Sequence, residues 1–260
     1  MKIKILTLFP SMFDGFKSES IIKRAIDKNI VKIEIIDMRT YSLDKHHHVD
    51  DTPCGGGAGM VIKCDVIDRA LKANRGDNSY VCLMTPQGRP YKQEMALEFA
   101  KKEEIILICG HYEGFDERVR DYVDDEISIG DFVLTGGEVP AMAISDSIIR
   151  LLDDAITKES HEDDSFSYGL LEYPQYTRPI EYNGKSVPEV LLNGNHKLIR
   201  EYHLKEALRK TLLRRPDLLE NREFTKEEIK LLNEIKKEEG LEWKKLEFYF
   251  IFHHFLENME

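Results

Sequence analysis

The 260-residue sequence lacks several features, and each absence narrows the class of protein. It has only four cysteines, Cys54, Cys64, Cys82 and Cys109, and no two of them have the CxxC spacing typical of metal or redox sites. Because Cys82 and Cys109 lie in apolar runs, we expect reduced thiols, two of them in the core, and a cytoplasmic protein. No window approaches the ~18 apolar residues of a membrane span, and the first apolar run is too short for a signal peptide.

Positive charge is also scarce, with 37 Lys and Arg against 48 Asp and Glu, a net charge of −11. This balance argues against broad electrostatic attraction to nucleic acid. The exception is residues 197–215, where seven cations and two carboxylates give a local net charge of +5. Such a block either stabilises the C-terminus of a helix or contacts phosphates. An excess of this size in an acidic chain favours phosphate contacts.

Strand-like and helix-like segments alternate through the first 150 residues. Apolar runs rich in β-branched residues predict strands over 2–9, 31–38, 80–85 and 104–109, and two short strands on either side of Gly130 within 124–143. Helical periodicity covers 11–28, 64–73, 91–103, 115–123 and about 138–152. This alternation predicts an α/β fold with a mostly parallel sheet covered on both faces.

The pattern changes after about residue 152. Residues 153–179 have little periodicity and many polar side chains, and helical periodicity returns from about Pro188. We therefore expect an α/β domain over 1–160, a flexible linker over 161–175, a helical domain over 176–240 and an extension over 241–260 with no assigned role.

Three glycine-bearing loops follow predicted strands: 86–88, 110–114 and 130–137. Ligands of parallel α/β sheets bind beyond the carboxyl ends of the strands, and glycine lets the backbone approach a ligand closely. The three loops meet at one place if their strands are neighbours. The plainer alternative is three tight turns, since the stretch DDEISIGDFVLTGGEVPAMA (124–143) fits neither GxGxxG nor GxxxxGK[ST].

Three other segments are candidate sites, and each has a plainer reading. Residues 46–48 are consecutive histidines, but adjacent side chains diverge in a strand or a helix, so no metal site is expected. The run CGGGAG (54–59) lacks the Lys-Ser/Thr pair of a P-loop and suits a mobile loop over a ligand or a nucleic-acid backbone. Residues 161–166 carry carboxylates that either act as a general base or form a solvated acidic linker.

Several longer motifs occur in a fixed order. They are VDDTPCGGGAGM (49–60), TPQGRPY (85–91), ICGHYEGFDERV (108–119), SIGDFVLTGGEVPAM (128–142), EDDSF (162–166), GLLEYPQYTRP (169–179), VPEVLLNGNH (187–196) and LRRPDLL (213–219). Together they closely resemble the bacterial tRNA (guanine-N1)-methyltransferases of the SPOUT class, from the first strand to about residue 235. One such motif is weak evidence, whereas this many in register are hard to reach by chance.

The resemblance implies a fold, a reaction and partners. The fold would be an α/β SPOUT fold with a deep trefoil knot in its parallel sheet, followed by a small C-terminal helical domain that binds tRNA. Loops of the knot would hold the methyl donor S-adenosyl-L-methionine, and Mg2+ is implied as an assisting ion. The enzyme would be a homodimer with active sites at the subunit interface. It would methylate N1 of the guanosine at tRNA position 37 when another guanosine precedes it.

The resemblance also assigns roles to residues of this chain. Asp164 would be the general base and Arg150 would hydrogen-bond guanine O6. The cofactor-binding residues would be Met84, Thr85, Pro86, Gly110, Glu113, Ser128, Ile129, Gly130, Asp131, Phe132, Val133, Leu134, Gly136, Gly137 and Pro140. The tRNA-binding residues would be Asp50, Gly55, Gly59, Lys197, Arg200, Arg209, Arg214 and Arg215.

Two departures and two rival readings belong beside this assignment. Phe132 stands where many relatives have tyrosine, so a hydroxyl contact is lost. The doubled Asp163-Asp164 leaves two candidate carboxylates, and the Ser-Phe that follows favours Asp164.

One rival is a nucleic-acid-binding module without catalysis, which needs neither Arg150 nor Asp164. The other is a SPOUT enzyme that modifies a different RNA base, and only its product would distinguish it.

Overall fold

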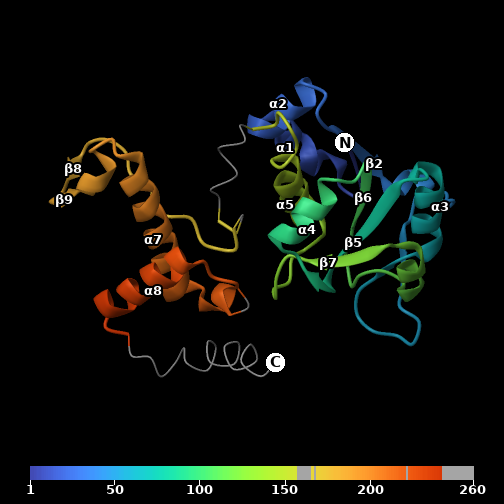
Figure 1. The fold of residues 1–260 in the computed structure, drawn as a ribbon. Helices are drawn as coiled ribbons and strands as arrows, with labels where there is room; N and C mark the ends of the chain where they lie inside the picture. Colours follow the sequence, from blue (N-terminus) through green and yellow to red (C-terminus); the bar gives the residue numbers. More distant parts are fainter. Residues whose placement is uncertain (157–164, 167, 221, 242–260) are drawn as a thin grey trace, which may run out of the picture. The chain divides into compact units, whose positions relative to one another are not determined.

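The computed structural model describes residues 1–156, 165–166, 168–220 and 222–241. The chain divides into two compact units, Met1–His161 and Glu162–Glu260. Figure 1 labels the main helices and several of the strands of both units. The predicted base Asp164 lies outside the described residues.

The first unit is built on a five-stranded sheet in which every neighbouring pair is parallel. The strand order is β2-β1-β6-β5-β7. The strands are β1 (Lys2–Thr7), β2 (Lys32–Asp37), β5 (Ser79–Pro90), β6 (Glu104–Cys109) and β7 (Asp125–Ser128). The parallel α/β architecture expected from the alternating pattern is therefore confirmed.

Both faces of the sheet are covered because the buried strands are apolar on both sides. In β6, Ile105 and Leu107 pack into one core, whereas Ile106 and Ile108 pack into the other. The first core includes α2 (Ser20–Asp27), α4 (Gln93–Phe99) and α5 (Glu138–Ile149). The second includes α3 (Cys64–Asn74) and the 3₁₀ helix η3 (Glu117–Tyr122), so the unit has three layers, as Figure 1 shows. Cys82 and Cys109 are buried and free, as predicted.

A charged cluster closes the sheet at the start of β6, away from the glycine loops. Glu104 accepts hydrogen bonds from the ammonium groups of Lys2 and Lys4, each at 3.0 Å, and from the hydroxyl of Ser79. Burial raises the pKa of the Glu104 carboxyl, but these three donors outweigh burial and lower that pKa to about 2. The carboxylate therefore stabilises the folded state wherever it is ionised.

Two expected helices are shorter or tighter than predicted. The segment 11–28 is interrupted at Ser20, whose φ of 55° breaks the helix, and divides into η1 (Pro10–Phe13), α1 (Asp14–Ser18) and α2. The segment 115–123 forms the 3₁₀ helix η3, in which only Val119 is buried. An element with a single buried side chain gains too little from packing to extend into a longer helix.

The second strand expected after Gly130 does not form. Strand β7 ends at Ser128, and residues 131–134 pair with no strand of the sheet. The chain turns at Gly130, with φ 148°, and Val133 is 86% exposed. The apolar residues after Gly130 are therefore surface residues of a loop.

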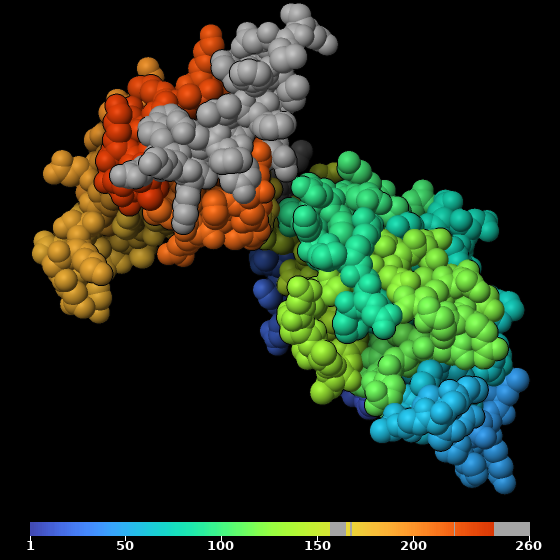
Figure 2. All heavy atoms as spheres, turned by 90° about the horizontal axis from the view of Figure 1, so that it is seen from below, coloured from blue at the N-terminus to red at the C-terminus, as the bar shows by residue number. Residues whose placement is uncertain are grey.

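The first unit also carries a small protruding loop. It follows the 3₁₀ helix η2 (Met38–Tyr41) and contains a short antiparallel pair, β3 (Asp50–Asp51) and β4 (Val61–Ile62). Figure 2 shows the blue-to-cyan segment of about residues 40–60 projecting from the body of this unit.

The second unit is mainly helical. Helix α7 (His196–Arg214) packs on α8 (Lys226–Glu238) around a core that includes Leu208, Leu231 and Ile235. Asn195 caps α7, and Thr225 with Glu228 forms a capping box on α8. The remaining elements are the hairpin β8 (Glu181–Tyr182) and β9 (Lys185–Ser186), η4 (Glu189–Leu191) and η5 (Pro216–Leu219). Across the described segments of both units, every helix is too short or too polar to cross a membrane.

Candidate functional site

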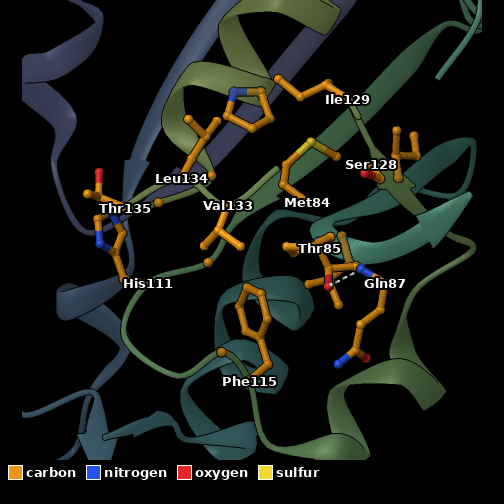
Figure 3. A pocket seen from close by; sticks show the side chains of 18 of the residues that line it. Met84, Thr85, Gln87, His111, Phe115, Ser128, Ile129, Val133, Leu134 and Thr135 are labelled. Atoms are coloured by element: carbon orange, nitrogen blue, oxygen red, sulfur yellow. Dashed lines mark hydrogen bonds between the residues drawn. The ribbon is translucent and has the colours of Figure 1, made fainter. Parts of the chain in front are cut away.

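The three glycine-bearing loops meet at one place. Strands β6, β5 and β7 are adjacent and parallel, so the loops that follow them leave the same edge of the sheet. They enclose a cavity of about 370 Å³, within the size range of small-molecule sites. The sequence-based expectation that these loops converge is confirmed, and Figure 3 shows their side chains around the cavity.

Every residue predicted to bind the cofactor lines this cavity except Asp131. The sequence did not single out the other lining residues, which are Leu83, Gln87, His111, Tyr112, Gly114, Phe115, Glu117, Arg120, Ile127 and Thr135. Several of these lie inside the same loops, so the loop positions were a sufficient signal for His111 and Tyr112. Arg120 carries no such signal, because it comes from η3.

The second and third loops are in backbone contact. The Gly137 amide donates a hydrogen bond to the Gly110 carbonyl at 2.8 Å. A Cβ atom added at Gly137 would lie 2.6 Å from Cys109 Cα and 2.7 Å from the Gly110 nitrogen. Since Gly137 has an ordinary φ of −83°, close approach of two backbones explains its identity.

The first loop leaves strand β5 and returns to it. Met84 and Arg89 both pair with Ile127 of β7, so the residues between them form an excursion over the cavity. Gly88 lies against the β7 backbone and has no room for a side chain. The guanidinium of Arg120 ties this excursion down, since it hydrogen-bonds Gln87 and also Glu126 of β7.

The protruding loop of the first unit is attached to the second pocket loop. The Glu113 amide donates to the Met60 carbonyl at 3.0 Å, and the Ile62 amide donates to the Gly114 carbonyl at 2.9 Å. Gly59, predicted to contact tRNA, lies against the Glu113 side chain, where a Cβ atom would overlap it. The structure therefore places one end of the predicted tRNA loop, which also contains Asp50 and Gly55, beside the cavity.

The predicted catalytic arginine does not line the cavity. Arg150 is the C-cap of α5, whereas Pro140, in the first turn of the same helix, lines the cavity. Ten helical residues at 1.5 Å each separate them by about 15 Å along the axis. The described part of one chain therefore does not bring Arg150 to its own cavity.

The basic block on α7 is largely neutralised within the second unit. Its ion pairs join Arg200 to Glu227, Lys205 to Glu234 and Glu238, Arg209 to Glu206, Glu238 and Glu239, and Arg215 to Asp217. The local charge of +5 counted only residues 197–215, so it overstates the free positive charge. Within the described segments, Lys197 and Arg214 make no ion pair, and both are exposed.

Comparison with known proteins places this geometry in a family. The model of the family described as tRNA (Guanine-1)-methyltransferase TrmD matches residues 1–221. A tRNA (guanine-N(1)-)-methyltransferase of Fusobacterium nucleatum is 62% identical over 240 residues, which cover 92% of this chain and 100% of the relative. Proteins of the same name from Bacillus licheniformis and Staphylococcus haemolyticus are 53% and 51% identical, over 91% and 92% of this chain and 99% and 98% of their own. The chain therefore belongs to the tRNA (guanine-1)-methyltransferase family.

Proposed function

We propose that this protein transfers the methyl group of S-adenosyl-L-methionine to N1 of the guanosine at position 37 of tRNA. The observation that carries the proposal is the family match over residues 1–221, which contain the three-loop cavity. Membership supports a methyltransferase that acts on tRNA guanine, and position 37 comes from the resemblance of the motifs. The reaction places the enzyme in the cytoplasm, where tRNA is modified.

The cavity suits a cofactor recognised mainly by backbone atoms. Its three walls are Met84–Pro86, Gly110–Glu113 and Ile129–Leu134, and each presents amides and carbonyls from a loop. When bound, S-adenosyl-L-methionine supplies an electrophilic methyl group. Because the walls are fixed by the backbone contact of Gly137 with Gly110 and by the Arg120 bonds, binding leaves little of the site to order.

The path of the chain supports a knot. Residues 129–137 begin at β7 on one edge of the sheet and end at Gly110, beyond β6, so they pass the carboxyl end of β5. The first loop leaves β5 there and returns to pair with β7. Two loops that meet at neighbouring strands in this way are compatible with the trefoil knot of the SPOUT fold, an exception to the usual rule against threaded chains.

Two residues have proposed chemical roles: Asp164 as the general base and Arg150 as an electrostatic stabiliser. Guanine N1 carries a proton and is a poor nucleophile until that proton leaves. The carboxylate of Asp164 would take this proton and so free the N1 lone pair to accept the methyl group that bound S-adenosyl-L-methionine would supply. Arg150 hydrogen-bonds O6 and stabilises the negative charge that develops on the ring.

Two observations support a homodimer with shared active sites. Arg150 lies about 15 Å along α5 from the cavity of its own chain, so a second subunit is the natural source of this group. Apolar side chains beside the cavity are exposed, among them Phe132 at 54%, Val133 at 86% and Val139 at 50%. Patches of this kind mark protein interfaces.

Subunit mixing tests the shared site. Gly137→Val removes the cofactor cavity, Arg150→Ala removes the arginine, and each homodimer should be inactive. If the arginine comes from the partner, a mixed dimer contains one intact site, so co-refolding the two variants should restore methyl transfer. No recovery, with mixed dimers verified by mass spectrometry, would place each site within one chain.

The helical second unit is proposed to bind tRNA, together with the loop that contains Asp50, Gly55 and Gly59. Of the predicted tRNA-binding cations, Lys197 and Arg214 make no ion pair among the described residues and are available for phosphates, while Arg209 is held by three carboxylates. An assisting Mg2+ ion stays a prediction, which methyl transfer measured with and without a chelator would test.

The experiment that tests the proposed function is methyl transfer to two transcripts of one tRNA, with guanosine or adenosine at position 37. We expect label only in the guanosine transcript, recovered as N1-methylguanosine. Label in both would retain the methyltransferase and reject position 37 as the target. Label in neither, with S-adenosyl-L-methionine bound, would leave a cofactor-binding protein whose substrate was misassigned.

A further inference from the structure

A chain of buried and partly buried hydrogen bonds lies beneath the third loop of the cavity. The Phe9 amide donates to the Thr7 hydroxyl at 2.9 Å, so the hydroxyl proton is left to donate to Glu138 Oε1 at 2.6 Å. Nε2 of His111 lies 2.7 Å from the other carboxylate oxygen, Oε2. These bonds join the end of β1, the loop after β6 and the first residue of α5.

Burial makes both donors of this network necessary. The Glu138 side chain is 1% exposed, and that of His111 is 15% exposed. Thr7 is fully buried and does not line the cavity. A buried carboxylate that loses a donor carries a large desolvation cost, so Glu138 holds its two partners in fixed positions.

This side-chain network lies next to the backbone hydrogen bond that joins two walls of the cavity. His111 follows Gly110, and Glu138 follows Gly137, so their side-chain bond joins the same two loops as the 2.8 Å bond from Gly137 to Gly110. The backbone of Gly136 rests directly on the pair, because an added Cβ atom would overlap both His111 Nε2 and Glu138 Oε2. Figure 3 shows His111 next to Thr135 at this end of the cavity.

We propose that Thr7, Glu138 and His111 are positioning residues that set the spacing of the second and third pocket loops and thereby the affinity for S-adenosyl-L-methionine. The inference rests on the proposed function and extends it to a residue, Thr7, that no ligand in the cavity can touch. A movement of Glu138 carries Gly136 and Gly137 with it, since the three are consecutive. The Phe9 ring, whose centroid is 4.6 Å from that of His111, holds the imidazole from its other side.

The test is a matched pair of substitutions at Thr7. Thr7→Val keeps the shape and removes the hydroxyl, whereas Thr7→Ser keeps the hydroxyl. We expect Thr7→Val to weaken S-adenosyl-L-methionine binding roughly tenfold in calorimetry, a coupling typical of residues in one network, and Thr7→Ser to retain affinity. Hydrogen exchange of the Gly137 amide should become faster in Thr7→Val only.

Controls separate positioning from general stability. Ser145 lies on α5, the helix that begins at Glu138. It is fully buried, and its hydroxyl has no hydrogen-bond partner among the described residues. Ser145→Ala should therefore leave cofactor affinity unchanged. If Thr7→Val fails to fold, Glu138→Gln, which keeps the side-chain volume and weakens both bonds, should show the same loss of affinity.

The outcomes are distinct. A lower melting temperature of Thr7→Val with unchanged affinity and unchanged Gly137 exchange would make the network merely structural and overturn the inference. If the unmodified protein does not bind S-adenosyl-L-methionine, the proposed function fails instead. Exchange of the Gly137 amide then still decides whether the network positions this loop.

Discussion

Replacing Gly137 by alanine adds one methyl group where two pocket loops touch through their backbones. The new Cβ would lie 2.6 Å from Cys109 Cα, whereas ordinary contact begins at 3.4 Å, so the loops must separate by about 0.8 Å. A shift of that size would stretch the bond from the Gly137 amide to Gly110 from 2.8 Å to about 3.6 Å, beyond hydrogen-bonding distance. Overpacking of this kind costs about 1–3 kcal/mol.

We expect Gly137→Ala to weaken S-adenosyl-L-methionine binding at least tenfold in isothermal titration calorimetry, because the change distorts two walls of the cavity together. The larger Gly137→Val should abolish binding. Gly15→Ala is the matched control, since its Cβ would meet no atom within 4 Å and it lies in α1, where alanine favours the helix. Affinity of Gly137→Ala within twofold of the unmodified protein would refute the assignment of this contact to the cofactor site.

Three further predictions follow from other parts of the chain. Asp164→Ala should retain cofactor affinity and lose roughly 100-fold or more in single-turnover methyl transfer, the scale of a lost general base; near-normal turnover, or an equal loss in Asp163→Ala, would remove Asp164 from that role. The three donors to Glu104 outweigh burial and lower the pKa of its carboxyl from 4.5 to about 2. The ionised carboxylate therefore stabilises the folded protein above pH 4.5, and this contribution is lost as the pH falls toward 2. This contribution amounts to about 3 kcal/mol. The free energy of urea unfolding should therefore fall more steeply between pH 6 and 2 in the unmodified protein than in Glu104→Gln. Parallel pH dependences of the two proteins would contradict this role of Glu104. Reversing Lys197 and Arg214 to glutamate should weaken tRNA binding and reduce its salt slope by roughly 2, whereas an unchanged slope would move the tRNA surface elsewhere.

The sheet could be predicted from the sequence because its signal is local. Continuous apolar runs such as 104–109 are buried on both faces, which only the interior of a covered parallel sheet permits. The convergence of the glycine loops followed from the same pattern, since parallel strands place their following loops on one edge. The positions of the three loops were therefore accessible from the pattern, and the individual lining residues came from the family resemblance. That set included Asp131, which does not line the cavity, and omitted Arg120, which does.

What the sequence did not reveal depends on contacts between distant segments. The apolar residues 131–134 resemble a strand, yet the chain turns at Gly130 and these residues pair with no strand of the sheet. The cations of α7 look free when counted along the chain, but the carboxylates of α8 pair with three of them, Arg200, Lys205 and Arg209. Thr7 and Glu138 are 131 residues apart, so no local pattern could join them.

Recognition of the cofactor by backbone atoms, as proposed, explains why the cavity has no side-chain motif in the sequence and why glycine is nevertheless required at certain positions. Amides and carbonyls are the same in every residue, so the only requirement on sequence is that no side chain occupies the contact points. At Gly88, Gly136 and Gly137 that requirement is strict, because an added Cβ would meet backbone at the first and last, and His111 and Glu138 at the second. Glycine is thus required at these positions because any side chain would clash. At Gly136 the clash would fall on the hydrogen-bonded pair of His111 and Glu138. Specific recognition then rests on the spacing between the loops, which Thr7 and Glu138 set although neither of them lines the cavity.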